Sequence, residues 1–187
     1  KRVQALGSAK NHMVVMPDAD LEQASDALIG AAFGSAGERC MAISVAVAVG
    51  NVADDLIKSI KPKINQIKVG PYNDKLSEMG PVVSKQALGR IKSLISSGVD
   101  DGADLLIDGR NIKLQGYENG YFIGPCLFDN VKTNMSIYKE EIFGPVLSIV
   151  RADNYDEALR LVKENPYGNG CSIFTRDGDT ARDFSNE

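Results

Sequence analysis

The chain has 187 residues, of which 43% are hydrophobic and 25% are charged, and its formal net charge is −4 at pH 7. This composition is typical of a globular domain, and the mixed charge argues against a surface for nucleic acid or an anionic membrane. The longest apolar run, residues 43–49, contains Ser44 and is too short to span a bilayer. The sequence begins Lys1-Arg2-Val3, without Met or a targeting segment, and we expect it to be part of a longer chain.

Hydrophobic periodicity predicts the elements of the first half of the chain. They are a strand at 14–16, a helix at 21–33, a strand at 43–49, a helix at 54–67 and a helix at 84–97. Asp18 and Asp20 supply capping side chains and early negative charge for the first helix. Pro62 lies inside the second helix and predicts a kink or a break there.

The second half continues the alternation of strands and helices. The pattern predicts strands at 105–107, 121–131 and 146–150, a helix at 155–163, a strand at 172–175 and a final helix near 179. The polar residues 110–120 are expected to form a hairpin or a surface loop. This order predicts an α/β fold with a layered, largely parallel sheet and flanking helices, and the absence of repeats or linkers predicts one domain over 1–187.

Cys40 is the most informative residue. It lies in the small, flexible segment 34–42, after a predicted helix and before a predicted strand, and the fixed positive charge of Arg39 is adjacent. These conditions favour the thiolate, which is the nucleophilic form of cysteine. The alternative is a buried structural thiol in a glycine-rich turn, and the segment alone leaves both interpretations open.

The other candidate polar and sulfur residues are expected to be structural. Cys126 and Cys171 both enter apolar runs, which predicts core packing. With three cysteines, no CxxC spacing and a single histidine, neither a zinc site nor a disulfide framework is indicated, and a reducing compartment fits best. His12 lies beside a strand and is expected to be structural, while Lys10 and Asn11 are expected to be solvated or to act as caps.

A second distinctive segment, residues 139–146, combines two adjacent carboxylates with Phe143 and a Gly-Pro turn that leads into a strand. A charged loop before a buried strand is the simpler interpretation. A functional interpretation is that a carboxylate holds a ribose diol while Phe143 flanks a flat ring. The residues by themselves do not decide between the two.

Taken in order, these motifs resemble the thiol-bearing catalytic domain of the aldehyde dehydrogenase superfamily, over essentially the whole chain. The stretches that carry the resemblance are 6–7, 17–20, 37–40, 80–83, 120–125, 140–146, 165–168 and 174–176. The resemblance implies that Cys40 is the nucleophile and that Glu141 and Phe143 contact NAD. It also implies that Leu6 and Gly7 approach the nicotinamide through their backbone.

Within the superfamily, residues 3–12 and 37–42 are most similar to the CoA-acylating methylmalonate-semialdehyde dehydrogenases. Hydrolytic members carry a Glu before the Leu-Gly pair, where it activates water, and this chain has Ala5 there. Without that base, a thioester on Cys40 should persist until coenzyme A attacks it. The resemblance implies NAD-dependent oxidative decarboxylation of malonate or methylmalonate semialdehyde to acetyl-CoA or propionyl-CoA.

The subfamily gives Arg39 a role, because a guanidinium beside the nucleophile can bind a substrate carboxylate in bidentate fashion. The alternative is that Arg39 pairs with Glu38 or another acid and only positions the loop. A hydrolytic aldehyde dehydrogenase with a base elsewhere and a non-catalytic assembly module also remain open as functions.

The chain lacks a GxGxxG-type loop, and the family's cofactor-binding domain, which precedes the thiol domain, is absent from it. That domain also supplies an amide to the oxyanion hole, which leaves only backbone donors near the thiol. We therefore expect the 187-residue chain alone to be inactive or nearly so. The family further implies a homo-oligomer, located in the cytoplasm of a bacterium or in the mitochondrial matrix of a eukaryote.

Overall fold

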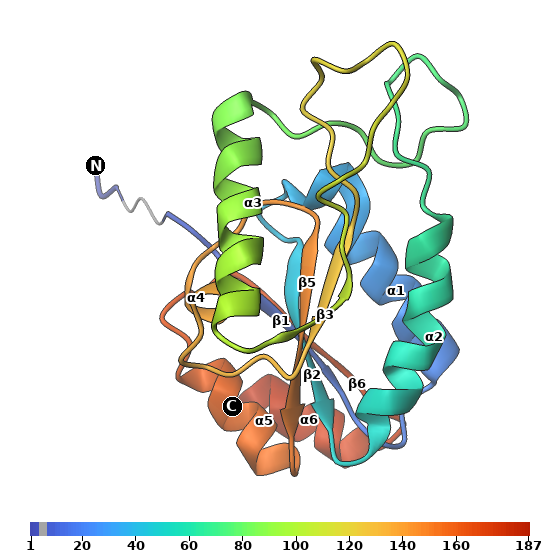
Figure 1. Cartoon of the computed structure of the whole chain (residues 1–187). Helices are drawn as coiled ribbons and strands as arrows, with labels where there is room; N and C mark the ends of the chain where they lie inside the picture. Colours follow the sequence, from blue (N-terminus) through green and yellow to red (C-terminus); the bar gives the residue numbers. More distant parts are fainter. Residues whose placement is uncertain (4–6) are drawn as a thin grey trace.

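The computed structural model describes residues 1–3 and 7–187, and these residues form a six-stranded sheet in the order β3-β4-β5-β2-β1-β6 (Figure 1). The strands are β1 (Asn11–Val15), β2 (Ile43–Val49), β3 (Asp104–Ile107), β4 (Cys126–Asp129), β5 (Val146–Ala152) and β6 (Cys171–Phe174). Each neighbouring pair is parallel except β3 with β4. The predicted layered, largely parallel α/β architecture is confirmed.

Helices cover both faces of this sheet. They are α1 (Leu21–Phe33), α2 (Val52–Gln66), α3 (Lys85–Asp100), α4 (Ser136–Lys139), α5 (Tyr155–Lys163) and α6 (Gly178–Asn186), with a 3₁₀ turn η1 (Gly34–Gly37) directly after α1. Figure 1 shows α1 and α2 on one side of the sheet and α3 on the other. Within the described residues, no helix combines the length and the apolar character needed to cross a membrane.

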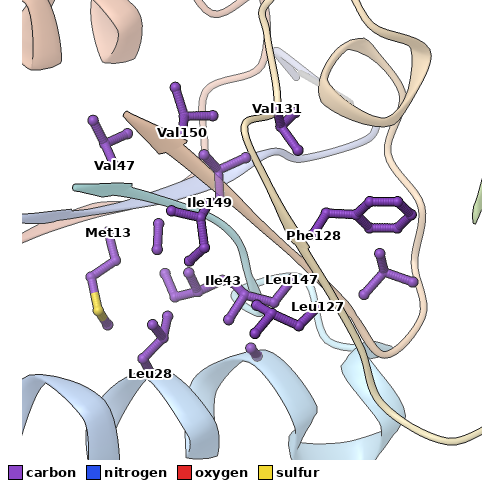
Figure 2. Packing of buried hydrophobic residues seen from close by; sticks show 14 of the residues in the cluster. Met13, Leu28, Ile43, Val47, Leu127, Phe128, Val131, Leu147, Ile149 and Val150 are labelled. Atoms are coloured by element: carbon purple, nitrogen blue, oxygen red, sulfur yellow. The ribbon is translucent and has the colours of Figure 1, made fainter. Parts of the chain in front are cut away.

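The core lies along the two central strands. Every residue of β2 except Ser44 is buried, as is every residue of β5 except Arg151, and such continuous burial is typical of parallel strands covered on both faces. Figure 2 shows Leu28 of α1 directed at the buried hydrophobic side chains of the core. Phe128 of β4 packs on the other face, since a Cβ added at Gly98 of α3 would lie 3.2 Å from its ring. Each fully buried aliphatic or aromatic side chain of this kind contributes about 1.5–3 kcal/mol.

Capping side chains set where the helices begin. Asp20 accepts a hydrogen bond from the backbone N–H of Gln23, and Ser84 accepts one from Ala87. Asn154 does the same at the start of α5. A cap of this type is worth about 1 kcal/mol, and it explains why the predicted bounds 21–33 and 155–163 are confirmed.

Of the kink or break predicted at Pro62, the break is wrong, because α2 runs from Val52 to Gln66 as one element. Leu56, Ile60 and Ile64 are all buried on both sides of the proline. Their burial outweighs the roughly 3 kcal/mol that an interior proline costs.

The predicted strand at 121–131 is also longer than the observed one. Only Cys126–Asp129 pairs as β4, because Pro125 has no N–H to donate and Gly124 bonds instead to the carbonyl of Gly109, at 2.9 Å. Residues 110–120 form a loop rather than a hairpin, and α4, only four residues long, was not predicted.

Candidate active site

The segment before Cys40 has an unusual backbone. Ser35, Ala36 and Gly37 are consecutive left-handed residues, with φ of 53°, 54° and 70°. For each non-glycine residue this conformation costs about 1–2 kcal/mol, so the turn is strained. A glycine is also required at position 37 because the Gly144 backbone lies close by: a Cβ on residue 37 would lie 2.2 Å from the Gly144 carbonyl oxygen. The strained turn and the loop before β5 are therefore in backbone contact.

Cys40 is exposed, which argues against the buried structural thiol. Its backbone carbonyl accepts hydrogen bonds from the side-chain amides of Asn11, at 2.9 Å, and Asn169. The Asn11 amide also donates to Ala42 O at 2.8 Å, and its oxygen accepts from Gly170 N at 3.1 Å. Asn11 thus joins β1 to the loops that contain Cys40 and Gly170.

Lys10 and Asn11, which were expected to be solvated or to act as caps, are not solvated, because both are buried, with exposed fractions of 3% and 2%. Lys10 lies directly before β1 and Asn11 opens it. The Lys10 ammonium donates to the carbonyl oxygens of Ile137 and Glu140, and the Asn11 amide donates to those of Cys40 and Ala42. Neither residue was singled out as functional from the sequence. Polar side chains at the start of a strand give no local signal of burial.

His12 has a structural position, as predicted. Its Nδ1 lies 2.7 Å from the carbonyl oxygen of Lys10 and must donate to it, so its Nε2 accepts from the Tyr138 hydroxyl at 3.0 Å. Burial lowers the pKa of His12 to about 4, with the charge of Lys10 acting in the same direction. The ring is therefore neutral near pH 7 and does not act there as an acid or a base.

Residues 141–143, which the family resemblance assigns to cofactor contact, are held by hydrogen bonds from two other segments. The Glu141 carboxylate accepts a hydrogen bond from Ala9 N at 3.0 Å. Arg90 of α3 donates to the carbonyl of Glu141 and, at 2.8 Å, to that of Ile142. Phe143 follows with φ of 52° and a side chain that is 39% exposed. A left-handed phenylalanine is a rare conformation, and here it leaves the ring at the surface.

Cys40 lines one pocket of about 330 Å³ together with Glu141 and Phe143, which lie more than 100 residues further along the sequence. Its remaining lining residues are Ser8, Ala9, Gly168 and Asn169. The volume is at the lower end of the range for small-molecule sites. The pocket thus brings together the two motifs that the sequence left undecided.

The other predicted site residues lie around this pocket. Gly7 is exposed, and its neighbour Ser8 lines the pocket. Leu6 and Ala5 lie outside the described residues. Arg39 does not line the 330 Å³ pocket, although it borders a narrow cleft together with Cys40 and Glu141.

Arg39 is directed back toward the end of α1. Its Nε donates to Ser35 Oγ at 3.1 Å, and its guanidinium lies against Gly34. Glu38 is not its partner, because that carboxylate accepts from Val83 N at 3.1 and 3.2 Å. Partial burial raises the pKa of Glu38.

The remaining two cysteines differ from each other. Cys126 is fully buried, and desolvation raises its pKa to about 11, so it is unreactive near neutral pH. The expectation of core packing is wrong for Cys171, which is exposed. It opens β6, a strand that pairs with β1 and ends the sheet on that side.

Comparison with known proteins agrees with this arrangement. The sequence model described as "Aldehyde dehydrogenase family" matches residues 1–187. The chain belongs to the aldehyde dehydrogenase family. It is 55% identical to a malonate-semialdehyde dehydrogenase of Pseudomonas aeruginosa, over 100% of the chain and 38% of that protein. It is 50% identical to the human methylmalonate-semialdehyde/malonate-semialdehyde dehydrogenase [acylating], mitochondrial, over 99% of the chain and 34% of that protein.

Solved structures of the family superimpose closely. A Sinorhizobium meliloti protein crystallised with NAD matches with a TM-score of 0.96 and 63% identity, over 97% of this chain and 37% of that one. The methylmalonate-semialdehyde dehydrogenase of Oceanimonas doudoroffii matches with a TM-score of 0.95 and 49% identity, over 97% and 38%. The chain therefore spans between one third and two fifths of the length of these relatives.

Proposed function

We propose that this chain is the thiol-bearing domain of a longer CoA-acylating aldehyde dehydrogenase, whose cofactor-binding domain lies outside residues 1–187. The observation that supports this most strongly is the convergence of Cys40, Glu141 and Phe143 on one pocket. An exposed thiol beside a ring and a carboxylate suits attack on an aldehyde next to a bound nicotinamide. The human and bovine relatives, whose names include "[acylating]", support the same reaction.

In this proposal the Cys40 thiolate adds to the aldehyde carbon and forms a thiohemiacetal. Bound NAD would supply the hydride acceptor, and loss of a hydride from the thiohemiacetal would leave a thioester on Cys40. The β-carboxylate of a malonate-type substrate then leaves as carbon dioxide, and its bonding electrons pass to the α-carbon, which takes up a proton. The CoA thiol attacks the thioester carbon, which forms acetyl-CoA or propionyl-CoA and releases Cys40.

The residues present fit NAD. One oxygen of the Glu141 carboxylate is bound to Ala9 N, and no hydrogen bond joins the other oxygen to any described residue, which leaves it for a ribose hydroxyl. The exposed ring of Phe143 can flank a flat nicotinamide. Ser8, which follows Gly7, lines the pocket, and the family resemblance implies that the backbone of Leu6 and Gly7 approaches the cofactor.

The surroundings of the thiol favour CoA over water as the acyl acceptor. Among the described residues that line the Cys40 pocket, Glu141 is the only carboxylate, and it is bound to Ala9 N. Glu38 lies nearby in sequence, but its carboxylate is bound to Val83 N. Ala5 cannot act as a base. Among the described residues of the pocket, Glu141 is therefore the only carboxylate that could activate water, and in this proposal its free oxygen binds the ribose instead.

Arg39 is the proposed carboxylate ligand of a malonate or methylmalonate semialdehyde. Its Nε is bound to Ser35, while no hydrogen bond joins its two terminal nitrogens to any described residue. These nitrogens are the paired donors that a carboxylate binds in bidentate fashion, and they lie beside the narrow cleft that Arg39 borders with Cys40.

The proposal extends to assembly and location. As the family resemblance implies, the whole protein is expected to be a homo-oligomer. The human and bovine relatives are named mitochondrial, which supports the matrix for a eukaryotic source, and the cytoplasm is proposed for a bacterial one.

The test uses the full-length protein with malonate semialdehyde and NAD, and it measures products with and without CoA. We expect CoA-dependent turnover and acetyl-CoA as product, lost in Cys40→Ser and retained in the control Cys171→Ser. Free acid formed equally well without CoA would identify a hydrolytic enzyme. No NAD reduction with any aldehyde, together with a Cys40 no more reactive than a free thiol, would indicate a non-catalytic assembly module.

A further inference from the structure

Lys10 is a buried lysine that the proposed reaction does not use. Its ammonium group donates to the carbonyl oxygens of Ile137, at 2.6 Å, and Glu140, at 2.7 Å. Ile137 lies within α4, and Glu140 caps its C-terminal end. Carbonyls at a helix C-terminus lack partners within the helix and favour a cation, so Lys10 binds the end of α4.

The same short stretch of chain also holds Glu141. Ala9, directly before Lys10, donates its N–H to the Glu141 carboxylate at 3.0 Å. Lys10 thus fixes the backbone one residue before Glu141 while Ala9 fixes the side chain. On the far side, Arg90 binds the carbonyls of Glu141 and Ile142. Two cations from different elements therefore hold the backbone of this segment in one position.

We propose that Lys10 is a positioning residue for the cofactor-binding segment, residues 140–143. The ammonium group of Lys10 holds the end of α4, so that Glu141 faces the pocket of Cys40. This inference rests on the proposed function, in which Glu141 contacts NAD. Lys10 itself does not line the 330 Å³ pocket and therefore acts through Glu141.

The charge of Lys10 changes near neutral pH. Desolvation lowers the pKa of Lys10 to about 7. The positive charge of Arg90 also lowers it, while the negative charges of Glu141 and Glu140 raise it. His12, whose own pKa is lowered in part by the charge of Lys10, is neutral there and adds no charge. Charge-assisted hydrogen bonds are about twice as strong as neutral ones. The hold on α4 is therefore strong below pH 7 and weakens above it.

The experiment measures the Kd of NAD for the full-length protein at pH 6 and pH 8. Wild type should bind about 3- to 10-fold more weakly at pH 8, with a midpoint near 7. Lys10→Met, which keeps the chain length but removes the donors, should raise Kd about 10- to 100-fold at pH 6 and bind equally at both pH values. Lys58→Met, which changes an exposed lysine of α2 far from this segment in sequence, is the control and should match wild type.

Lys10→Arg supplies a permanent charge and should bind as wild type at pH 6 and keep that affinity at pH 8. If wild type binds NAD with no change near pH 7, or if Lys10→Met binds as tightly as wild type, the inference is wrong. The pH dependence of NAD binding by the wild type tests the inference even if a variant fails to fold. A wild type that binds no NAD at any pH would instead overturn the proposed function.

Discussion

Gly37→Ala tests the contact between the nucleophile segment and the cofactor segment. Gly37 has φ of 70°, and an added Cβ would lie 2.2 Å from the carbonyl oxygen of Gly144 and 2.6 Å from its carbon. Contacts below 3.0 Å are essentially never seen for a Cβ, so the two backbones must move apart by about 1 Å. Because the obstacle is backbone, no side-chain rotation can relieve it.

The expected loss of stability in Gly37→Ala has two parts. The left-handed conformation costs an alanine about 1–2 kcal/mol. Forcing the two loops apart adds about 1–3 kcal/mol, as for other overpacked sites. A displacement of about 1 Å between Cys40 and Glu141 should also slow hydride transfer about 100-fold.

Gly50→Ala is the matched control. Gly50 has φ of 63°, but its nearest neighbour for a Cβ is Pro17 Cγ at an ordinary 3.4 Å. The free energy of unfolding of Gly50→Ala should fall by only about 1–2 kcal/mol, and its rate of hydride transfer should be unchanged. Urea unfolding and single-turnover NADH formation in the full-length protein measure the two effects. Equal losses of stability in both variants, with normal hydride transfer in Gly37→Ala, would refute the argument.

Three further outcomes follow from burial and backbone. Iodoacetamide at pH 7.5 should label Cys40 and Cys171 but leave Cys126 unlabelled, as peptide mapping would show; labelling of Cys126 in the folded protein would contradict its burial. His12 has its pKa lowered from 6.5 to about 4, so the stability provided by the neutral ring is complete above pH 6.5. Up to about 3 kcal/mol should be lost as the pH falls through 4, and urea unfolding of His12→Gln should not show this loss. Pro62→Ala restores an N–H inside α2 and should raise the free energy of unfolding by about 1–3 kcal/mol; an unchanged midpoint in urea would contradict this.

The elements predicted most accurately are those with local signals. The helix at 21–33 and the strand at 43–49 have the predicted bounds, because a capping aspartate, an apolar stripe and a β-branched run each act within a few residues. The antiparallel pairing of β3 with β4 and the continuity of α2 through Pro62 were not predictable in this way. Both depend on packing between segments that are distant in the sequence.

The candidate site shows the same division. Motifs resembling a known family predicted Cys40, Glu141 and Phe143, and the fold places them in one pocket. The sequence does not predict that Lys10 and Asn11 are buried, because the carbonyl oxygens that bind their side chains come from distant segments. Such partners become visible only in three dimensions.

The central claim is that an acyl group rests on Cys40 until CoA removes it. The most direct measurement incubates the full-length protein with malonate semialdehyde and NAD without CoA, quenches it in acid and determines the mass of the peptide that contains Cys40. We expect an acyl adduct on that peptide, which disappears when CoA is added before the quench. Free acid released over many turnovers without CoA, and no adduct on Cys40, would contradict it.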